Sequence, residues 1–438
     1  MAPDVEKRTI ARISWRLVPY IMLLYFVAFL DRVNIGFASL TMNHDLGFSS
    51  TVFGIGAGIF FVGYFLFEVP SNLILHKVGA RIWIARVMVT WGLVSGCMAF
   101  VKGETSFYVL RFLLGVAEAG FFPGIILYLS YWFPAKNRAS VTALFMAAAP
   151  ISTALGSPIS GALLEMHGFA GLAGWQWMFL LEAVPAVVLG VVTFFFLTDR
   201  PAKATWLTED EREWLVATMA EEEARRAPAK GAHNPLKALA DPRVLALSLV
   251  YFGTSAGLYT LGIWSPQIIK SFGLSSFATG FVNAVPAVVA VVAMVLWARH
   301  SDRTGERTWH VVIACLIAIV GLAMAAESTT VVAVVLALVV VNIGISSSKP
   351  PLWSMPTMFL SGSSAAAGIA TINSIGNLGG FAGPAIIGWI KDETGSFAGG
   401  LYFVAACLVL SAGLVLLLSR SQKKTAAAVA AKPSTIHS

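Results

Sequence analysis

The chain has 438 residues, of which 57% are hydrophobic and only 12% are charged. A soluble domain carries about 25% charged residues, so this chain has about half the charge that covers a soluble globule with hydrated side chains. The composition excludes a soluble enzyme and a disordered protein. It indicates a protein that crosses a membrane several times.

The basic charge balance does not indicate nucleic-acid binding. The formal net charge is +7, but the basic residues stand between apolar segments and form no stripe with interleaved aromatic residues. Cys97, Cys315 and Cys407 lie far apart inside apolar runs, which predicts buried thiols and no metal-ligand pattern. No motif indicates an enzyme, a metal site or a cofactor.

Twelve apolar segments reach the length of about 20 residues that a helix needs to cross a bilayer. In chain order they lie near 15–38, 52–75, 82–101, 105–132, 139–165, 176–198, 243–269, 276–298, 309–326, 330–360, 365–390 and 397–419. Several contain proline, which membrane helices tolerate where neighbouring helices or a cavity satisfy the backbone. The pattern predicts an all-α membrane protein.

The loops between these segments predict the orientation of the chain. Most Lys and Arg residues fall in the loops of one side, whereas only Lys102, Lys270 and Lys391 fall in those of the other. Because basic loops stay in the cytoplasm, we expect both termini to be cytoplasmic, in a bacterial inner membrane. The longest loop contains a charged helical stretch at 208–226, which is typical of a solvated helix face or a linker.

Two matches at one offset predict an internal repeat. NLILHKVGAR at 72–81 aligns with ARHSDRTGER at 298–307, and Pro158 in GSPISG and Pro384 in GPAIIG are also 226 residues apart. Two parallel six-helix repeats with a site between them are a known plan of secondary transporters. We therefore expect an N-terminal half, a cytoplasmic linker loop, a C-terminal half and a disordered tail, at 1–199, 200–242, 243–420 and 421–438.

The repeated loop resembles a motif of the major facilitator superfamily, G-x-x-x-D-R-x-G-R-R. DRTGER at 302–307 matches it well, whereas the first copy has Asn72 for the opening Gly and His76 for the Asp. In that superfamily the motif forms a charge network that steadies the outward-facing state. The resemblance assigns this role to Lys77, Gly79, Arg81, Asp302, Arg303, Gly305 and Arg307. Positive charge that only sets the topology is the alternative interpretation.

Five ionisable residues stand inside apolar segments: Asp31, Arg32, Arg111, Glu118 and Lys349. A charge near the bilayer centre costs at least about 2.5–3.5 kcal/mol on insertion scales, so each needs a partner, a cavity or a function. The side chains of adjacent helical residues point about 100° apart. We therefore expect Asp31 and Arg32 each to find an interaction partner on another helix. Arg111 and Glu118 are seven residues apart and share one helix face. Transport is favoured over purely structural ion pairing for these residues.

Lys349, Glu68 and Glu182 carry weaker signals. Lys349 stands in SSSKPPLWSMP, which predicts a helix broken at its prolines. It is either a second cation for a dianionic substrate or a lysine that reaches out from a displaced helix end. Glu68 and Glu182 are placed near helix ends, so we expect them to be solvated or paired rather than proton carriers.

Three segments resemble the anion:cation symporter family of the superfamily, which includes transporters of tartrate, phthalate and sugar acids. They are FLDRVNIGFAS in segment one, RFLLGVAEAGFFPG in segment four and INSIGNLGGFAGP in segment eleven. The resemblance implies that Asp31 and Glu118 are proton-coupling carboxylates. It also implies a substrate site, to which we add Lys349, formed by Arg32, Arg111, Tyr64, Trp353, Asn373 and Asn377.

Two departures from that family bear on the substrate. Phe29 stands where some members have Tyr, and FMAAAP at 145–150 is apolar where some have Gln. The site is therefore less suited to a polyhydroxylated sugar acid.

We expect a monomeric symporter that takes up a small organic carboxylate, first a tartrate-like dicarboxylate, with protons by alternating access. The expected partners are that anion, protons and the lipid bilayer. The alternatives are an aromatic acid such as phthalate or hydroxyphenylacetate, a sugar acid, an anion exchanger or efflux protein and, in another class, a transporter-like membrane sensor.

Overall fold

The computed structural model describes residues 3–225, 241–356 and 362–430, and in this part of the chain the regular secondary structure is helical. The helices are α1 (Pro3–Leu46), α2 (Ser50–Val78), α3 (Ala80–Cys97), α4 (Glu104–Glu118), α5 (Phe121–Trp132), α6 (Ala135–Leu164), α7 (Gly174–Phe196), α8 (Glu209–Arg225), α10 (Pro242–Lys270), α11 (Ser276–Thr304), α12 (Thr308–Ala326), α13 (Val331–Ser354), α14 (Gly362–Asn377), α15 (Gly379–Thr394) and α16 (Ala398–Ala430).

The helices agree with the expected twelve membrane segments. Eleven candidate spans among the described residues are long and apolar enough to cross a membrane. The remaining expected segment, 365–390, is divided at Leu378 into α14 and α15, which have only 16 residues each. Segment four is divided too, between α4 and α5, where Gly120 has a φ of 86° that glycine adopts without strain.

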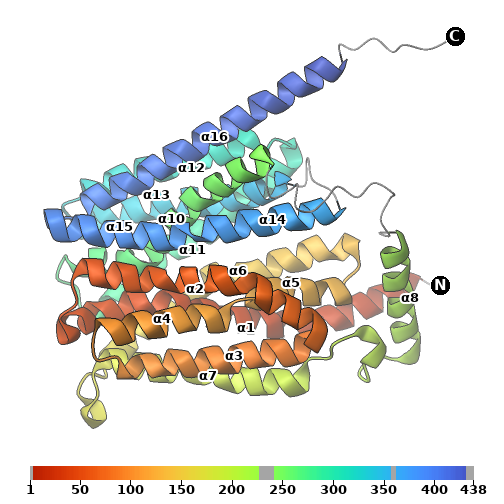
Figure 1. The fold of residues 1–438 in the computed structure, drawn as a ribbon, viewed down its shortest axis with the longest axis horizontal. Coiled ribbons are helices and arrows are strands. Elements are labelled where there is room, and N and C mark those ends of the chain that lie inside the picture. The colour runs from red at the N-terminus through yellow and green to blue at the C-terminus, as the bar shows by residue number, and fades with distance from the viewer. Residues whose placement is uncertain (1–2, 226–240, 357–361, 431–438) are drawn as a thin grey trace.

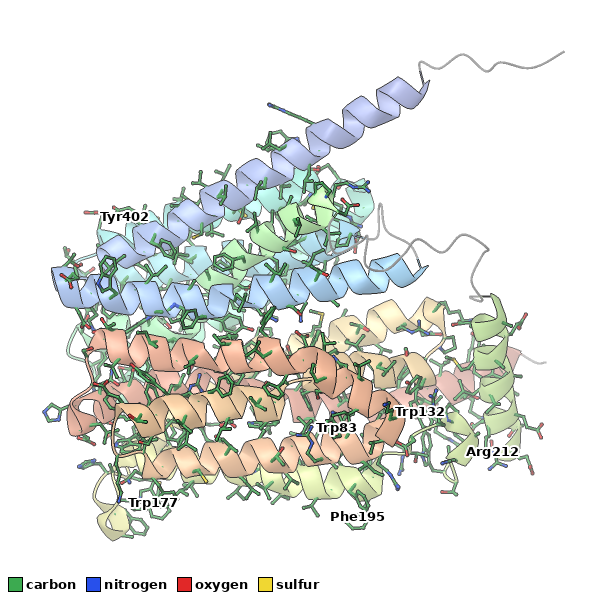
Figure 2. The ribbon with its side chains drawn as sticks, in the orientation of Figure 1. Trp83, Trp132, Trp177, Phe195, Arg212 and Tyr402 are labelled. Carbon is green, nitrogen blue, oxygen red and sulfur yellow. The ribbon has the colours of Figure 1, made fainter. Side chains whose placement is uncertain are left out.

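The molecule consists of two bundles, α1–α7 and α10–α16, which lie one above the other in Figure 1. Trp91 and Trp132 are fully buried in the first bundle, whereas Trp264 of the second packs edge-on against Phe53 of the first, so part of the core is shared by both bundles. Large apolar side chains cover the outside, and Figure 2 shows Phe195 of α7 pointing away from the bundle with 79% of its surface exposed. An apolar exterior suits contact with lipid rather than water.

The two bundles are packed tightly at the end that lies away from the chain termini. A Cβ on Gly54 of α2 would lie 2.4 Å from the carbonyl oxygen of Pro384 in α15, and one on Gly280 of α11 would lie 2.4 Å from that of Ser157 in α6. Small residues at these positions let the backbones approach. Figure 1 shows α2 and α15 side by side there, with both termini at the other end.

Helix α8 of the linker is docked on the N-terminal bundle rather than solvated on all sides. Glu211 is fully buried and accepts from Arg8 Nε at 3.0 Å and from Arg12 Nη1 at 2.7 Å, both on α1. Trp214 and Leu215 are buried on the same helix. The charged stretch at 208–226 therefore has one apolar face, and this face packs the linker helix against the first half.

The structure corrects two expectations about helix continuity. Helix α16 continues to Ala430, whereas the sequence predicted disorder from 421, because Ala, Gln and Lys are strong helix formers; residues 431–438 lie outside the described residues. Helix α13 runs through Pro350 and Pro351 to Ser354, so the predicted break is wrong.

Candidate functional site

Arg32 and Glu118 form an ion pair between α1 and α4. Arg32 Nε donates to Glu118 Oε1 at 2.6 Å, and Arg32 Nη2 lies 2.5 Å from the same oxygen. The Glu118 side chain is 1% exposed and that of Arg32 is 10% exposed. The rings of Phe60 and Tyr64 lie 5.7 Å and 5.3 Å from Arg32 Cζ. A charge-assisted pair in an aromatic environment is strong, so Glu118 is the group that holds Arg32 in this state.

Asp31 points away from Arg32, as expected for neighbours on a helix. Its carboxylate, 2% exposed, accepts from Trp91 Nε1, from Ser95 Oγ at 2.5 Å and from Asn34 Nδ2 at 2.9 Å. Trp91 and Ser95 belong to α3, so the two adjacent charges of α1 interact with different helices. Three donors satisfy a buried carboxylate without a cation.

Arg111 holds the backbone of α2. Its Nη2 donates to the carbonyl of Ala57 at 2.8 Å and its Nε to that of Gly56 at 3.3 Å, and the residue is 2% exposed. Arg111 and Glu118 share a helix as predicted, but only Glu118 contacts Arg32. The Arg111 guanidinium therefore contacts the backbone of α2, the helix that carries Tyr64.

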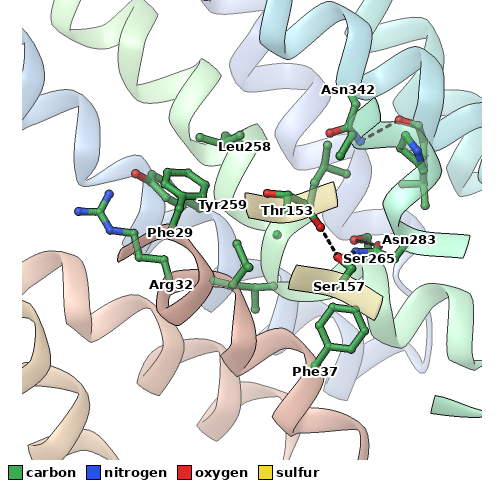
Figure 3. Close-up of a pocket in the computed structure, with 17 residues that line it drawn as sticks. Phe29, Arg32, Phe37, Thr153, Ser157, Leu258, Tyr259, Ser265, Asn283 and Asn342 are labelled. Atoms are coloured by element: carbon green, nitrogen blue, oxygen red, sulfur yellow. Dashed lines mark hydrogen bonds between the residues drawn. The ribbon is translucent and has the colours of Figure 1, made fainter. Parts of the chain in front are cut away.

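A cavity of about 60 Å³ lies between the two bundles and is shown in Figure 3. Its polar lining comes from both halves: Arg32, Thr153, Ser157, Tyr259, Ser265, Asn283 and Asn342. Ser265 Oγ donates to Asn283 Oδ1 at 2.6 Å within the second half, and Asn283 Nδ2 donates to Ser157 Oγ of the first half at 3.0 Å, so the second bond crosses the interface.

Several of these cavity residues were not predicted from the sequence to belong to the site. Tyr259, Asn283 and Asn342 are single neutral polar residues inside apolar segments, and this signal is weaker than that of a charge. Thr153 and Ser157 follow the apolar stretch 145–150 on the same helix, so segment five does supply polar groups. These neutral polar residues would be found by searching each apolar segment for any side chain that can form a hydrogen bond, whether or not it is charged.

Two glutamates are more buried than expected. Glu68 is 5% exposed and Glu182 is 3% exposed. Of the two expected states, solvated or paired, the structure shows the second, because each residue accepts hydrogen bonds inside the protein.

Glu68 connects the two halves. Asn373 Nδ2 of α14 donates to Glu68 Oε1 at 2.7 Å, and Ser374 Oγ donates to Glu68 Oε2 at 3.0 Å. Asn373 was assigned to the substrate by resemblance, and in this state its amide binds Glu68. Tyr64 lies one turn before Glu68 on α2, and its ring faces Arg32.

The other residues assigned to the substrate site, Lys349, Trp353 and Asn377, do not line the cavity. Lys349 is half-buried and lies seven residues after Asn342, so it shares the cavity-facing side of α13. None of the described acidic residues forms an ion pair with it. The ring of Trp353 packs edge-on to Tyr251 with centroids 4.8 Å apart. Asn377 is 7% exposed at the end of α14.

The two motif loops share a glycine turn but use different charge partners. Gly79 and Gly305 both have positive φ, 97° and 67°, which explains why each loop needs glycine there. The Arg81 backbone N–H donates to Asp199 Oδ1 at 2.9 Å, which ties the α2–α3 turn to the end of α7. In the second loop Arg307 Nη1 lies 2.6 Å from Asp302 Oδ1.

The remaining motif residues, Lys77 and Arg303, are exposed at these loops. The His76 side chain lies outside the described residues. Arg81 contacts Asp199 and Arg307 contacts Asp302, each within its own half, so these residues organise each half in this state.

Two helical bundles with a polar cavity between them define a secondary-transporter architecture. The sequence model of the Major Facilitator Superfamily matches residues 21–384, and the chain belongs to this superfamily, which confirms the expectation from the loop motif.

Relatives and solved structures agree with this membership. A protein of Agrobacterium vitis named "Putative tartrate transporter" is 76% identical over 421 residues, which cover 96% of this chain and 93% of that protein. The "Quinolone resistance transporter" of Acinetobacter baumannii is 42% identical and covers 94% of this chain and 95% of its own. An inward-facing, unoccupied bacterial homolog of the human lysosomal transporter Spinster matches with a TM-score of 0.76, covering 97% and 99% of the two chains at 16% identity. The last match shows the fold alone.

Proposed function

We propose that this transporter is a symporter that couples protons to the uptake of a small organic carboxylate, with a tartrate-like dicarboxylate as its first substrate. The observation that carries the proposal is the Arg32–Glu118 pair at the edge of the cavity. The high identity to a protein named for tartrate transport supports the choice of substrate.

The ion pair supplies a mechanism for coupling. A substrate carboxylate and the Glu118 carboxylate are the same chemical group, so they compete for the Arg32 guanidinium. A proton on Glu118 removes the competing charge and frees Arg32 for the anion. When the anion leaves, Arg32 returns to Glu118 and the proton is released. Proton and anion binding are thus linked by one coupling free energy.

The second proton-coupling carboxylate in this proposal is Asp31, whose donors on α3 stabilise its charged form. Arg111 acts indirectly, by fixing the part of α2 that carries Tyr64. On the substrate, Arg32 takes one carboxylate and Lys349 the other. Tyr259 and Asn283 supply hydrogen bonds to the hydroxyl groups between them.

The direction of the cycle follows from the proposed orientation. With both termini in the cytoplasm of a bacterium, the tightly packed end of α2 and α15 is periplasmic, and this state is closed to the outside. Rocking of the two halves about the cavity then exposes Arg32 to each side in turn. Each monomer contains the complete set of groups for this cycle.

A second function, efflux or exchange, is favoured by the relative named for quinolone resistance. Both functions are tested by uptake of labelled tartrate into proteoliposomes with an imposed inside-alkaline pH gradient. Symport predicts accumulation that collapses when the gradient is dissipated. Uptake that ignores the gradient but needs tartrate inside the vesicle would establish exchange and refute symport.

A further inference from the structure

Asp392, near the end of α15, binds the start of α2 in the other half of the molecule. Its Oδ1 accepts from the Ser50 backbone N–H at 2.9 Å, and its Oδ2 accepts from the Thr51 backbone N–H at 2.7 Å and from Thr51 Oγ1 at 2.6 Å. Ser50 and Thr51 begin α2, and the first N–H groups of a helix have no carbonyl partner within that helix. A carboxylate of the second half therefore caps a helix of the first half, at the end where the helix dipole favours negative charge.

The reciprocal contact lies on the other side of the interface. Glu165 directly follows α6, and its Oε1 accepts from the Phe277 backbone N–H at 3.2 Å. Phe277 is the second residue of α11, which belongs to the second half. Here a carboxylate of the first half caps a helix of the second, so each half supplies one carboxylate and one helix start.

The internal repeat relates these two contacts. Ser50 and Ser276 are the first residues of α2 and α11, and they are 226 residues apart, which is the offset of the repeated segments. Glu165 and Asp392 are 227 residues apart, one residue more than this offset. The two carboxylates therefore occupy corresponding places in the two halves, and so do the helix starts that they cap.

A glycine allows the close approach at each contact. A Cβ on Gly161 of α6 would lie 2.7 Å from the carbonyl oxygen of Ser276, and one on Gly388 of α15 would lie 2.2 Å from that of Ser50. Each capping carboxylate stands four residues after its glycine, about one helical turn further on. Both sides of the interface thus combine a backbone contact that only glycine permits with a cap on a helix of the opposite half.

We propose that Glu165 and Asp392 form a reciprocal latch that holds this end of the transporter, away from the chain termini, closed. When the two halves rock apart here, both caps break and the N–H groups at the starts of α2 and α11 lose their carboxylate partners. The latch therefore raises the free energy of the state that is open at this end. The inference rests on the proposed alternating access, but not on proton coupling or on the choice of substrate.

The two members of the latch differ in strength. Over the residues that the structure describes, Asp392 accepts three hydrogen bonds from α2, whereas Glu165 accepts one from α11. The residue beside Asp392 supports a further bond between the halves. Lys391 Nζ donates to Gln267 Oε1 at 3.1 Å, and Gln267 Nε2 donates to Ser39 Oγ of α1 at 2.7 Å. Asp392 therefore contributes the larger share of the latch.

The latch is tested by the distance between the halves at this end, in the purified full-length protein without substrate. Spin labels are attached to cysteines placed at the exposed positions Lys102 of the first half and Thr329 of the second, with the native cysteines replaced by alanine. Asp392→Ala should raise the ratio of open to closed molecules about fivefold, as expected for the loss of a helix cap. Glu165→Ala should act in the same direction with a smaller effect. Asp392→Lys, which places a cation at the start of α2, should open this end further than Asp392→Ala.

Matched variants separate the latch from a general loss of charge. Glu393→Ala removes the neighbouring exposed carboxylate of α15, and Glu104→Ala removes an exposed carboxylate in the first turn of α4, within its own half. Both should keep the wild-type distance distribution. Opening by rocking should also shorten the distance at the other end, between labels on Ala217 and Arg420, whereas a loosened fold broadens both distances.

An Asp392→Ala distribution equal to those of the wild type and Glu393→Ala would overturn the proposal, and so would broadening at both ends of the molecule. The measurement involves no substrate and no pH gradient, so this failure would leave proton symport standing. Uptake that ignores the pH gradient would refute symport and leave the latch standing.

Discussion

The two halves of the molecule share a loop motif and a helix order, yet they bury different chemistry. Among the described buried residues, the membrane helices of the first half contain Asp31, Glu68, Arg111, Glu118 and Glu182. The corresponding buried polar residues of the second half are neutral Ser, Thr and Asn side chains together with His310. We infer that the first half holds protons and charge, whereas the second half recognises the neutral parts of the substrate.

The features that the halves do share concern the fold. Gly79 and Gly305 both end a helix with positive φ, and glycines of both halves allow the close contacts at the packed end. A duplicated chain keeps what both copies need for folding, while each copy is free to change its buried polar residues. The comparison therefore assigns coupling variants to the first half and specificity variants to the second.

The largest effect is expected for Glu118→Gln. Gln cannot take up and release the proton that frees Arg32, so accumulation driven by a pH gradient should be lost, while exchange of bound anion remains. Proteoliposome uptake and counterflow measure the two activities. Glu104→Gln, an exposed change on the same helix, should behave like the wild type. Normal accumulation in Glu118→Gln would break the assignment of coupling to the first half.

Arg32→Lys and Arg111→Lys divide the first half into a binding cation and a structural one. Lysine lacks the planar fork of arginine, so Arg32→Lys should weaken anion binding about tenfold or more, equal to at least about 1.4 kcal/mol. Arg111→Lys should chiefly lower Tm, because it loses the donors to Gly56 and Ala57. Calorimetric titration and thermal unfolding measure the pair, and an equal loss of affinity in both variants would contradict the division.

Lys349 is the exception in the second half, since it is a cation on the cavity-facing side of α13. Lys349→Ala should weaken a dicarboxylate about tenfold, roughly 1.4 kcal/mol, and change the affinity for a monocarboxylate much less. Lys349→Arg, which keeps the charge, serves as the control. Equal losses for both anions would remove the role of Lys349 in recognising a second carboxylate.

The smallest effect is expected where Glu68 joins the halves. Glu68→Ala loses the hydrogen bonds from Asn373 and Ser374, so the present state should be less populated while the substrate-binding groups stay unchanged. Spin labels at the exposed positions Ala217 of α8 and Arg420 of α16 report the distance between the halves. An unchanged distance distribution would show that these bonds do not bias the conformation.

The sequence predicted the fold and the ionisable part of the site, because charge inside an apolar run is a strong and local signal. The opposite directions of Asp31 and Arg32 follow from helix geometry alone. Burial of Glu182 was missed because it depends on the packing of α7 against α6, where Ser160 donates to Glu182, and no local pattern encodes that contact. The bonds of Glu68 to α14 and of Asn283 to α6 join residues far apart in the chain, and no local pattern encodes them.

The central claim is that Glu118 binds a proton when the anion takes Arg32 from it. The direct test is proton uptake on tartrate binding to the purified protein, followed with a pH indicator in weakly buffered solution. We predict that the wild type takes up protons as it binds tartrate and that Glu118→Gln binds tartrate with less proton uptake. Proton uptake of zero in the wild type, or equal uptake in the two proteins, would contradict the account.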